Sequence, residues 1–179
     1  MKVVLDTCVL FPTVMRAMLL GVAARGHFTP LWSARILEEW YHAAAKLGPV
    51  GQDQASAEIA LLRADWAGAE LPPAPGLEAR LWLPDVNDIH VLATAVSGSA
   101  EAIITLNAKD FPRRELADQG LQRIDPDGFP YQFWLADQSG VAAVGAGVLE
   151  QANHLSGQHW ELRGLMKKAR LPRLAKAIG

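Results

Sequence analysis

The sequence predicts an α/β/α three-layer domain with a parallel central sheet, followed by a C-terminal helical extension. Between residues 1 and 129, short apolar runs alternate with segments of helical periodicity. Strands that alternate with helices pair in parallel and are joined by right-handed crossovers. From about Tyr131 the helical periodicity continues with no further strand candidate. We therefore assign residues 1–129 to the α/β domain and residues 130–179 to the helical extension.

The first half of the α/β domain is predicted to contain one strand and three helices. They are a buried strand at 3–5 and helices at 12 to about 25, at 34–46 and at about 52–66. Pro12 suits the first turn of a helix, and Gly26 stops that helix. Ser33 is a typical N-cap, and Gly48 with Pro49 ends the helix that Ser33 begins.

The second half of the α/β domain is predicted to contain three strands and one helix. They are strands at 69–71, 102–105 and 121–124 and a helix that begins at 85–88. The Pro-rich segment 72–76 is the strongest break in the chain. Residues 102–105 are continuously apolar up to the threonine, which is typical of a strand buried on both faces.

The composition predicts a globular, cytoplasmic protein. Half of the residues are apolar, which excludes a disordered chain. Cys8 is the only cysteine, so no intramolecular disulfide can form. Asp6 interrupts the apolar start of the chain, so no secretory signal is predicted. No apolar run has the length of a membrane span, and we expect no membrane association.

Charge is unevenly distributed along the chain. Residues 161–179 hold six basic side chains and one acidic side chain, whereas the preceding 160 residues hold 11 basic and 18 acidic ones. The balance is therefore +5 at the C-terminal end and −7 in the rest. This asymmetry indicates a basic end that meets an acidic partner, either nucleic acid or protein. An ordinary solvated helix with lysines near its end explains it equally well.

Acidic and amide side chains follow predicted strands or begin a predicted helix. Asp6 comes directly after the first strand, Asn107 and Asp110 follow the strand at 102–105, and Asp88 lies near a helix N-terminus. Ligands of open parallel sheets bind beyond the carboxyl ends of the strands. Each acid alone is also explained as a cap or turn former. Gathered together, the carboxylates would repel one another unless a divalent cation held them, and such a site suits phosphodiester hydrolysis.

Four segments carry a resemblance to a known family, and they occur in the family's order and spacing. They are residues 4–10 (VLDTCVL), 33–40 (SARILEEW), 84–95 (PDVNDIHVLATA) and 103–111 (IITLNAKDF). Through them the chain resembles the PIN-domain nucleases over residues 1–129, specifically the VapC-type toxins of bacterial toxin–antitoxin pairs. The C-terminal residues are similar to the helical extension of one subgroup of these toxins.

The resemblance implies a Mg²⁺- or Mn²⁺-dependent endoribonuclease with a quartet of acidic residues. The implied quartet is Asp6, Glu39, Asp88 and Asp110. Asp6 is the implied central metal ligand, with Asp88 and Asp110 as further ligands. Glu39 is expected to orient or deprotonate the attacking water. Whether one or two ions bind stays open.

Further residues are expected to support this site or to contact the substrate. They are Thr105, Asn107, Asp85, His90 and Arg16. The first two are expected to hydrogen-bond to the acids, and Asp85 is either a further acid of the metal shell or a turn residue. His90 is expected to order a carboxylate or touch phosphate, and Arg16 to contact phosphate, although a packed or surface histidine explains His90 equally well.

Two positions leave questions open. Glu38 and Glu39 are neighbours on one predicted helix, and only the family pattern favours Glu39. Many PIN domains have Asn or Ser two residues after the first acid, where this chain has Cys8. Cysteine cannot make the amide contacts of Asn, and its usual role is that of a small buried apolar residue.

The implied partners are an RNA substrate, a cognate antitoxin of a type II pair and a second copy in a homodimer. The alternative function is a non-catalytic PIN scaffold that binds RNA or protein. A phosphatase of the haloacid-dehalogenase type also begins with a strand and Asp, but it needs a second Asp where Cys8 stands.

Overall fold

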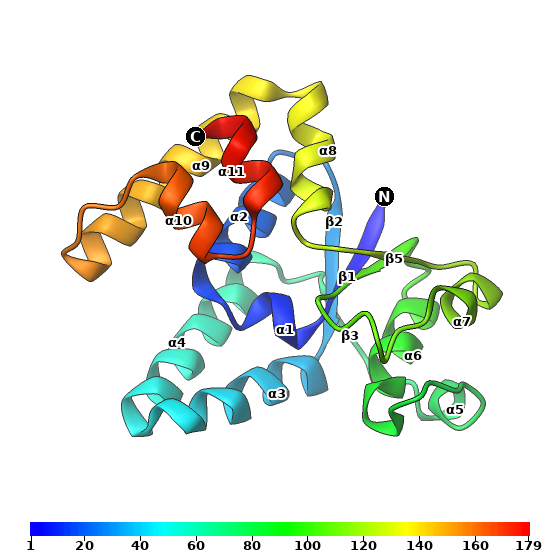
Figure 1. Cartoon of the computed structure of the whole chain (residues 1–179). Helices are drawn as coiled ribbons and strands as arrows, with labels where there is room; N and C mark the ends of the chain where they lie inside the picture. Colours follow the sequence, from blue (N-terminus) through cyan, green and yellow to red (C-terminus); the bar gives the residue numbers. More distant parts are fainter. The chain divides into compact units, whose positions relative to one another are not determined.

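The computed structural model describes residues 1–179 and contains one five-stranded parallel sheet of order β3-β2-β1-β4-β5 (Figure 1). The strands are β1 (Lys2–Leu5), β2 (Thr29–Ser33), β3 (Glu70–Leu71), β4 (Ala102–Ile104) and β5 (Gln122–Ile124). The predicted α/β fold with a parallel central sheet and helices after it is confirmed.

β1 lies at the centre of the sheet because its side chains are apolar in an unbroken run. Val3, Val4 and Leu5 are fully buried, as expected for a parallel strand with both faces covered. β1 pairs with β2 on one side and β4 on the other, and Leu5 stands beside Ile104 at the carboxyl ends. The residues that follow these two strands are therefore neighbours.

β2 was not among the predicted strands, and Pro30 explains why. Proline has no N–H to donate, so a proline within a short run argues against a strand inside a sheet. In this sheet the Thr29 N–H bonds to Met1 on the β1 side, and the Trp32 N–H bonds to Ala69 on the β3 side. Pro30 shares the β3 side with Trp32 but lies before the point where β3 begins, so no ladder bond is lost.

The contacts between residues divide the chain into two compact units. The sheet unit comprises Met1–Phe11 and Thr29–Arg123, and the helical unit comprises Pro12–Phe28 and Ile124–Gly179. The division into an α/β domain at 1–129 and a helical extension at 130–179 stays a prediction. The compact units differ from it chiefly in that a helix from the first thirty residues joins the C-terminal helices.

The sheet unit contains six α-helices and two 3-10 helices. They are α1 (Thr7–Leu10), α3 (Ala34–Ala44), η1 (Ala45–Leu47), α4 (Pro49–Asp65), α5 (Pro75–Glu78), η2 (Val86–Asp88), α6 (Ile89–Ser97) and α7 (Arg113–Asp118). Ser33 caps α3 as predicted, since its hydroxyl accepts from the Ile36 N–H at 3.3 Å. α6 packs against β1, β2 and β4, and Val91, Leu92, Ala93 and Ala95 of this helix are buried.

The helical unit contains five helices. They are α2 (Thr13–Ala24), α8 (Gly128–Ala136), α9 (Gln138–Ser156), α10 (Leu162–Lys168) and α11 (Pro172–Ile178). α2 contacts α8, α9 and α10. Phe28, Phe129 and Phe133 form an aromatic cluster, with the first two ring centroids 4.8 Å apart. The buried carboxylate of Asp127 accepts from the Arg173 N–H at 3.0 Å and so caps α11.

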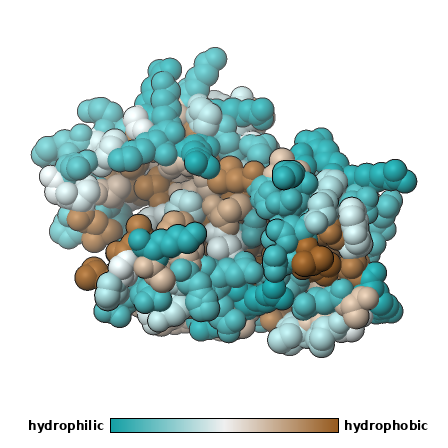
Figure 2. Space-filling model, turned by 60° about the horizontal axis from the view of Figure 1, so that its bottom comes forward, coloured by the Kyte–Doolittle hydropathy of each residue, from teal (hydrophilic) through white to brown (hydrophobic).

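The surface is largely hydrophilic. On the face shown in Figure 2 the exposed apolar residues form separate patches between hydrophilic ones. Large apolar side chains are exposed on η1 and α4, where Leu47, Val50 and Leu61 are each more than 60% exposed. No helix combines the length and the apolar character that crossing a lipid bilayer requires.

α2 and α9 approach each other closely at Gly21, and this gives a test of the packing. A Cβ at Gly21 would overlap Val144, whereas a Cβ at the exposed Gly147 of α9 would meet nothing. Replacing a helical glycine by alanine gains about 1 kcal/mol of stability where space allows. We expect Gly147→Ala to raise the free energy of unfolding by about that amount. Gly21→Ala is expected to lower it by about 1–3 kcal/mol, because overpacking outweighs the propensity gain.

Urea unfolding of the two variants and the wild type measures both effects. The variants are matched, since each adds one methyl group to a helix of the same unit. Equal stabilisation by both would contradict the close contact of α2 with α9.

Candidate functional site

Asp6 is fixed at the carboxyl ends of β1 and β4. The carboxylate is only 6% exposed, and its Oδ2 accepts from the Thr105 hydroxyl at 2.7 Å. Thr105 in turn accepts from the Asn107 N–H at 2.9 Å. The register of the two strands places Asp6 beside Thr105, because the Asp6 N–H bonds to Ile104. The predicted neighbours Asp6, Thr105 and Asn107 therefore do meet.

Cys8 also holds Asp6, which differs from the small apolar role expected for it. Its Sγ lies 3.0 Å from Asp6 Oδ2 and accepts from the Leu106 N–H at 3.2 Å. Burial, together with the negative charge of Asp6, raises the pKa of the Cys8 thiol to about 12. The group therefore stays protonated near neutral pH and donates its S–H to Asp6.

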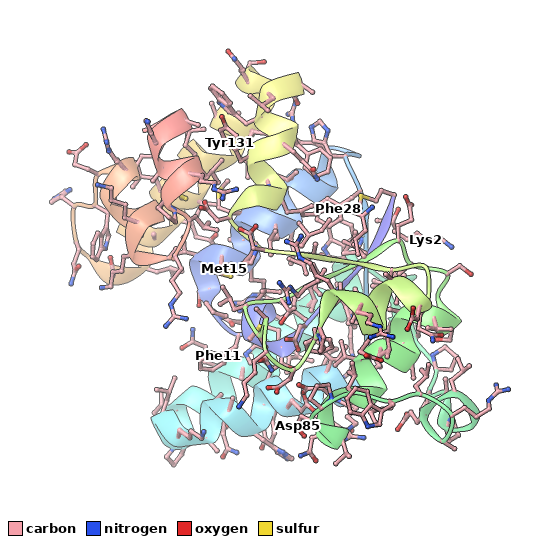
Figure 3. All side chains as sticks on the ribbon, turned by 45° about the vertical axis from the view of Figure 1, so that its right-hand side comes forward. Lys2, Phe11, Met15, Phe28, Asp85 and Tyr131 are labelled. Atoms are coloured by element: carbon pink, nitrogen blue, oxygen red, sulfur yellow. The ribbon has the colours of Figure 1, made fainter.

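Three aspartates converge in front of α6. The carboxylate oxygens of Asp85, Asp88 and Asp110 include one from each residue that lie within 4.8 Å of one another. Asp85, labelled in Figure 3, precedes η2, and Asp88 ends it. Asp85 is the N-cap of η2 and has extended backbone, and the single turn of η2 brings Asp88, its last residue, back beside it.

Neighbouring amides fix this triad. Asp85 Oδ1 accepts from both the backbone N–H and the side-chain amide of Asn87, each at 2.9 Å. The Asn107 amide donates to Asp88 Oδ2 at 3.2 Å. Asp85 thus forms the turn that was one of the two roles left open for it, and it also lies in the acidic cluster, while its role as a metal ligand stays a prediction.

The charges of the cluster act on Asp88 most strongly. Burial raises the pKa of Asp88 to about 6, with further contributions from the charges of Asp6, Asp85, Asp110 and Glu39. Asp6 and Glu39 are thus near enough to Asp88 for their charges to act on it, in addition to the two other members of the triad. Without a cation the cluster is electrostatically unfavourable.

Glu39 is held in its ionised form from three directions. Its Oε2 accepts from the Thr7 hydroxyl at 2.9 Å, and its Oε1 lies 2.7 Å from His90 Nε2 and 3.8 Å from Arg35 Nε. Burial favours a higher pKa for Glu39, but the His90, Thr7 and Arg35 interactions outweigh it and the pKa lies below its ordinary value. His90 is 3% exposed, and its Nδ1 has no partner, so Nε2 carries the hydrogen toward Glu39.

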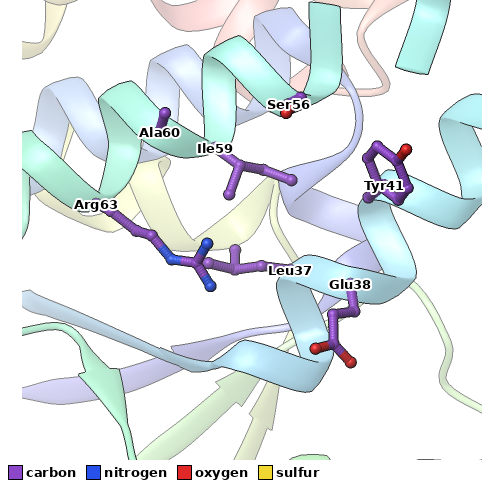
Figure 4. A pocket seen from close by; sticks show the side chains of 7 residues that line it. All are labelled: Leu37, Glu38, Tyr41, Ser56, Ile59, Ala60 and Arg63. Atoms are coloured by element: carbon purple, nitrogen blue, oxygen red, sulfur yellow. The ribbon is translucent and has the colours of Figure 1, made fainter. Parts of the chain in front are cut away.

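Glu38 points elsewhere. It is exposed and lines a groove of about 470 Å³ between α3 and α4, together with Tyr41, Ile59 and Arg63 (Figure 4). Of the two adjacent glutamates, only Glu39 hydrogen-bonds within the acidic site. The geometry therefore agrees with the residue that the family pattern favoured, although its catalytic role stays a prediction.

The loop that carries Asp110 is braced by Arg123. The guanidinium donates to the carbonyl oxygens of Ala108 at 2.6 Å and Phe111 at 3.0 Å, and Phe111 is fully buried. Arg16, predicted to contact phosphate, is 8% exposed and lies on α2 in the helical unit. Its predicted role stays a prediction.

Thr7, Arg35 and Arg123 support the site but were not predicted. Arg35 had a signal, because it stands four residues before Glu39 on the same helix and such pairs are neighbours. Thr7 and Arg123 had none, since their contacts depend on how the chain folds around the sheet.

The residues present suit a hard divalent cation. Mg²⁺ and Mn²⁺ prefer carboxylate and amide oxygens, and the triad offers three carboxylates. The charged neighbours that act on Asp88 are all acidic. The predicted ligands Asp88 and Asp110 belong to the triad, with Asp85 as the third member. Asp6 lies near enough for its charge to raise the pKa of Asp88.

Comparison with known proteins assigns the chain to a family. The family model described as the PIN domain matches residues 2–109, which include the whole acidic cluster except Asp110. Comparisons with curated proteins and with solved structures found no match. The match covers more than half of the chain, and the triad is consistent with the metal-dependent nuclease activity typical of the family. The chain belongs to the PIN domain family.

Proposed function

We propose that the protein is a Mg²⁺- or Mn²⁺-dependent endoribonuclease of the cytoplasm. The main support is the convergence of Asp85, Asp88 and Asp110, whose carboxylate oxygens include one from each residue that lie within 4.8 Å of one another. Burial raises the pKa of Asp88 to about 6, and the charges of these neighbours, of Asp6 and of Glu39 add to that effect. A cluster of like charges at the end of a sheet has a clear use if it holds a cation against a phosphodiester. PIN domains act on nucleic acid, and the resemblance to VapC-type toxins favours RNA.

Different residues of the chain would bind the cation, position its ligands and activate the attacking water. Asp88, Asp110 and Asp6 would hold the cation, with Asp85 beside them, and Thr105 and Cys8 would keep Asp6 in place. Bound there, the cation would supply positive charge to the scissile phosphate and to an attacking water. Glu39 would orient that water or accept its proton, because it is ionised and its rotation is restricted by Thr7 and His90.

We further propose that the protein is the toxin of a bacterial type II toxin–antitoxin pair. The resemblance to VapC-type toxins supports this, as does the α3–α4 surface. That surface has a groove of about 470 Å³, which is lined in part by the apolar side chains of Leu37, Ile59 and Tyr41, and Tyr41 is 38% exposed. Exposed apolar surface of this kind suits contact with an antitoxin or with a second copy in a homodimer.

Cleavage assays test the nuclease proposal. The purified protein is expected to cut RNA in Mg²⁺ or Mn²⁺ and to stop when EDTA is added. Asp6→Asn should lower the cleavage rate about a hundredfold or more, because it removes a charge from the metal site while keeping the size of the side chain. Asp53→Asn, at an exposed position of α4, is the matched control and should leave the rate unchanged. Full activity of Asp6→Asn would remove the proposed ligand.

Thermal unfolding tests the charge cluster without any substrate. The folded-state pKa of Asp88, about 6, lies above the ordinary value of 3.8, so its ionised form destabilises the fold above pH 6 and this penalty vanishes below about pH 4. In EDTA at pH 7.5, Asp88→Asn should therefore stabilise the protein by about 1 kcal/mol, a value reduced for solvent screening.

In Mg²⁺ the wild type should become more stable than Asp88→Asn, the reverse of their order in EDTA. Added Mg²⁺ should raise the melting temperature of the wild type, because a ligand that binds only the folded state stabilises it. The melting temperature of Asp88→Asn should rise much less. A wild-type melting temperature that does not respond to millimolar Mg²⁺ or Mn²⁺ would favour the alternative of a non-catalytic PIN scaffold.

A matched pair of variants tests the two glutamates. Glu39→Gln keeps the shape of the side chain but cannot accept a proton, so the cleavage rate should fall about tenfold or more while RNA binding stays intact. Glu38→Gln changes a neighbouring position on the α3–α4 groove and should cleave at the wild-type rate. The opposite ranking of the two cleavage rates would move the role to Glu38.

A further inference from the structure

The helical unit contains a pocket that the nuclease site does not use. It lies among α2, α9 and α10 and has a volume of about 390 Å³. The buried side chains of Met15, labelled in Figure 3, and Leu165 line it, and Ser156, Gln158 and Trp160 add polar and aromatic groups. Pockets of this size and mixed character accept flat organic groups.

Trp160 is held firmly at this pocket although its side chain is only partly buried. Its backbone N–H donates to Asn153 Oδ1 at 2.6 Å, and its carbonyl accepts from the Asn153 amide at 3.3 Å. Lys168 Nζ stands 4.5 Å from the centroid of the indole ring. The pocket therefore has an aromatic wall whose backbone is anchored and whose ring has a cation over it, a pairing that suits a nucleobase and its phosphate.

Exposed basic side chains continue from Lys168 along α10 and α11. We call them the basic surface: Arg163, Lys167, Lys168, Arg170, Arg173 and Lys176. All six are exposed, and none of them forms a salt bridge with a carboxylate. The buried carboxylate of Asp127 bonds to the backbone N–H groups of Arg173 and Leu174 and not to a basic side chain. The positive charge is thus available to an external partner.

We propose that the helical unit binds single-stranded RNA, with a base against Trp160 in the pocket and the phosphates along the basic surface. The assignment to RNA rests on the proposed function. Polyanion binding follows from unpaired cations, and a base can enter the pocket only if it is unstacked, which excludes a duplex. An acidic protein segment would satisfy the charges but has no general use for the aromatic pocket. The site also explains how a chain whose sheet unit is acidic attracts a polyanion.

Fluorescence anisotropy with a labelled 12-nucleotide uridine RNA tests the pocket. The full chain carrying Asp6→Asn is used in EDTA, so that cleavage cannot occur. Trp160→Ala should weaken binding about fivefold or more, and Trp160→Phe should restore most of the affinity, because stacking needs only an aromatic face. Trp82→Ala is the control, since Trp82 is 60% exposed in the sheet unit. A 12-base-pair duplex RNA should bind more weakly than the single strand.

The basic surface is tested by salt dependence. The double variant Lys167→Gln with Lys168→Gln should make the negative slope of log affinity against log salt less steep by about 1.4, as expected for two lost phosphate contacts. The control exchanges Arg113 and Arg114, two exposed basic residues of α7, for Gln and should leave the slope unchanged. Made in the chain that retains Asp6, each of these substitutions should leave the Mg²⁺-induced rise in melting temperature unchanged.

Each outcome decides the proposal. Equal affinities of wild type and Trp160→Ala, no RNA binding at all, or tighter binding of the duplex would overturn it. Loss of affinity in Trp160→Ala with RNA cleavage absent in the wild type would support this site while rejecting the nuclease function. Cleavage in the wild type with unchanged affinity in Trp160→Ala would support the nuclease function while rejecting this RNA-binding site.

Discussion

The pairing of β1 with β4 is the constraint on which the site depends. Because Leu5 stands beside Ile104, the first residues past both strands emerge together, and Asp6 meets Thr105 at 2.7 Å. A shift of one residue would send Asp6 to the other face of the sheet. The apolar run of β1 is bounded by the charged residues Lys2 and Asp6, so a shift would move a charged side chain into the buried part of the sheet. The position of the first acid is therefore determined by hydrophobic burial rather than by any interaction among the acids.

The acids themselves oppose folding, and the surrounding polar contacts hold them. Burial and four neighbouring carboxylates raise the pKa of Asp88, which is the electrostatic cost of the arrangement. Thr7 and His90 hold Glu39, Asn107 holds Asp88, and Arg123 fixes the loop before Phe111. These contacts restrict the side chains before any cation arrives. A preorganised site of this kind loses less entropy on binding a cation than a flexible one.

Local patterns predicted much of this structure, and long-range packing accounts for what they missed. Asp6 and Asp88 were visible because one follows an apolar run and the other begins a helix. The cap at Ser33 was predicted for the same local reason and is confirmed. β2 was missed because Pro30 argues against a strand, and its tolerance depends on where β3 begins. The triad with Asp85 depends on the single turn of η2 between Asp85 and Asp88 and on the loop that carries Asp110, which local sequence patterns do not predict.

The helical unit is built from two segments far apart in the sequence, Pro12–Phe28 and Ile124–Gly179, and this has a consequence for synthesis on the ribosome. α2 leaves the exit tunnel early, but α9, against which it packs, begins only at Gln138. At cellular elongation rates, α9 is synthesised on the order of ten seconds after α2, and the apolar face of α2 has no α9 to pack against during that time. Met18, Leu19 and Val22 are all fully buried in the folded protein. A nascent chain therefore exposes the apolar face of α2 until α9 has been synthesised.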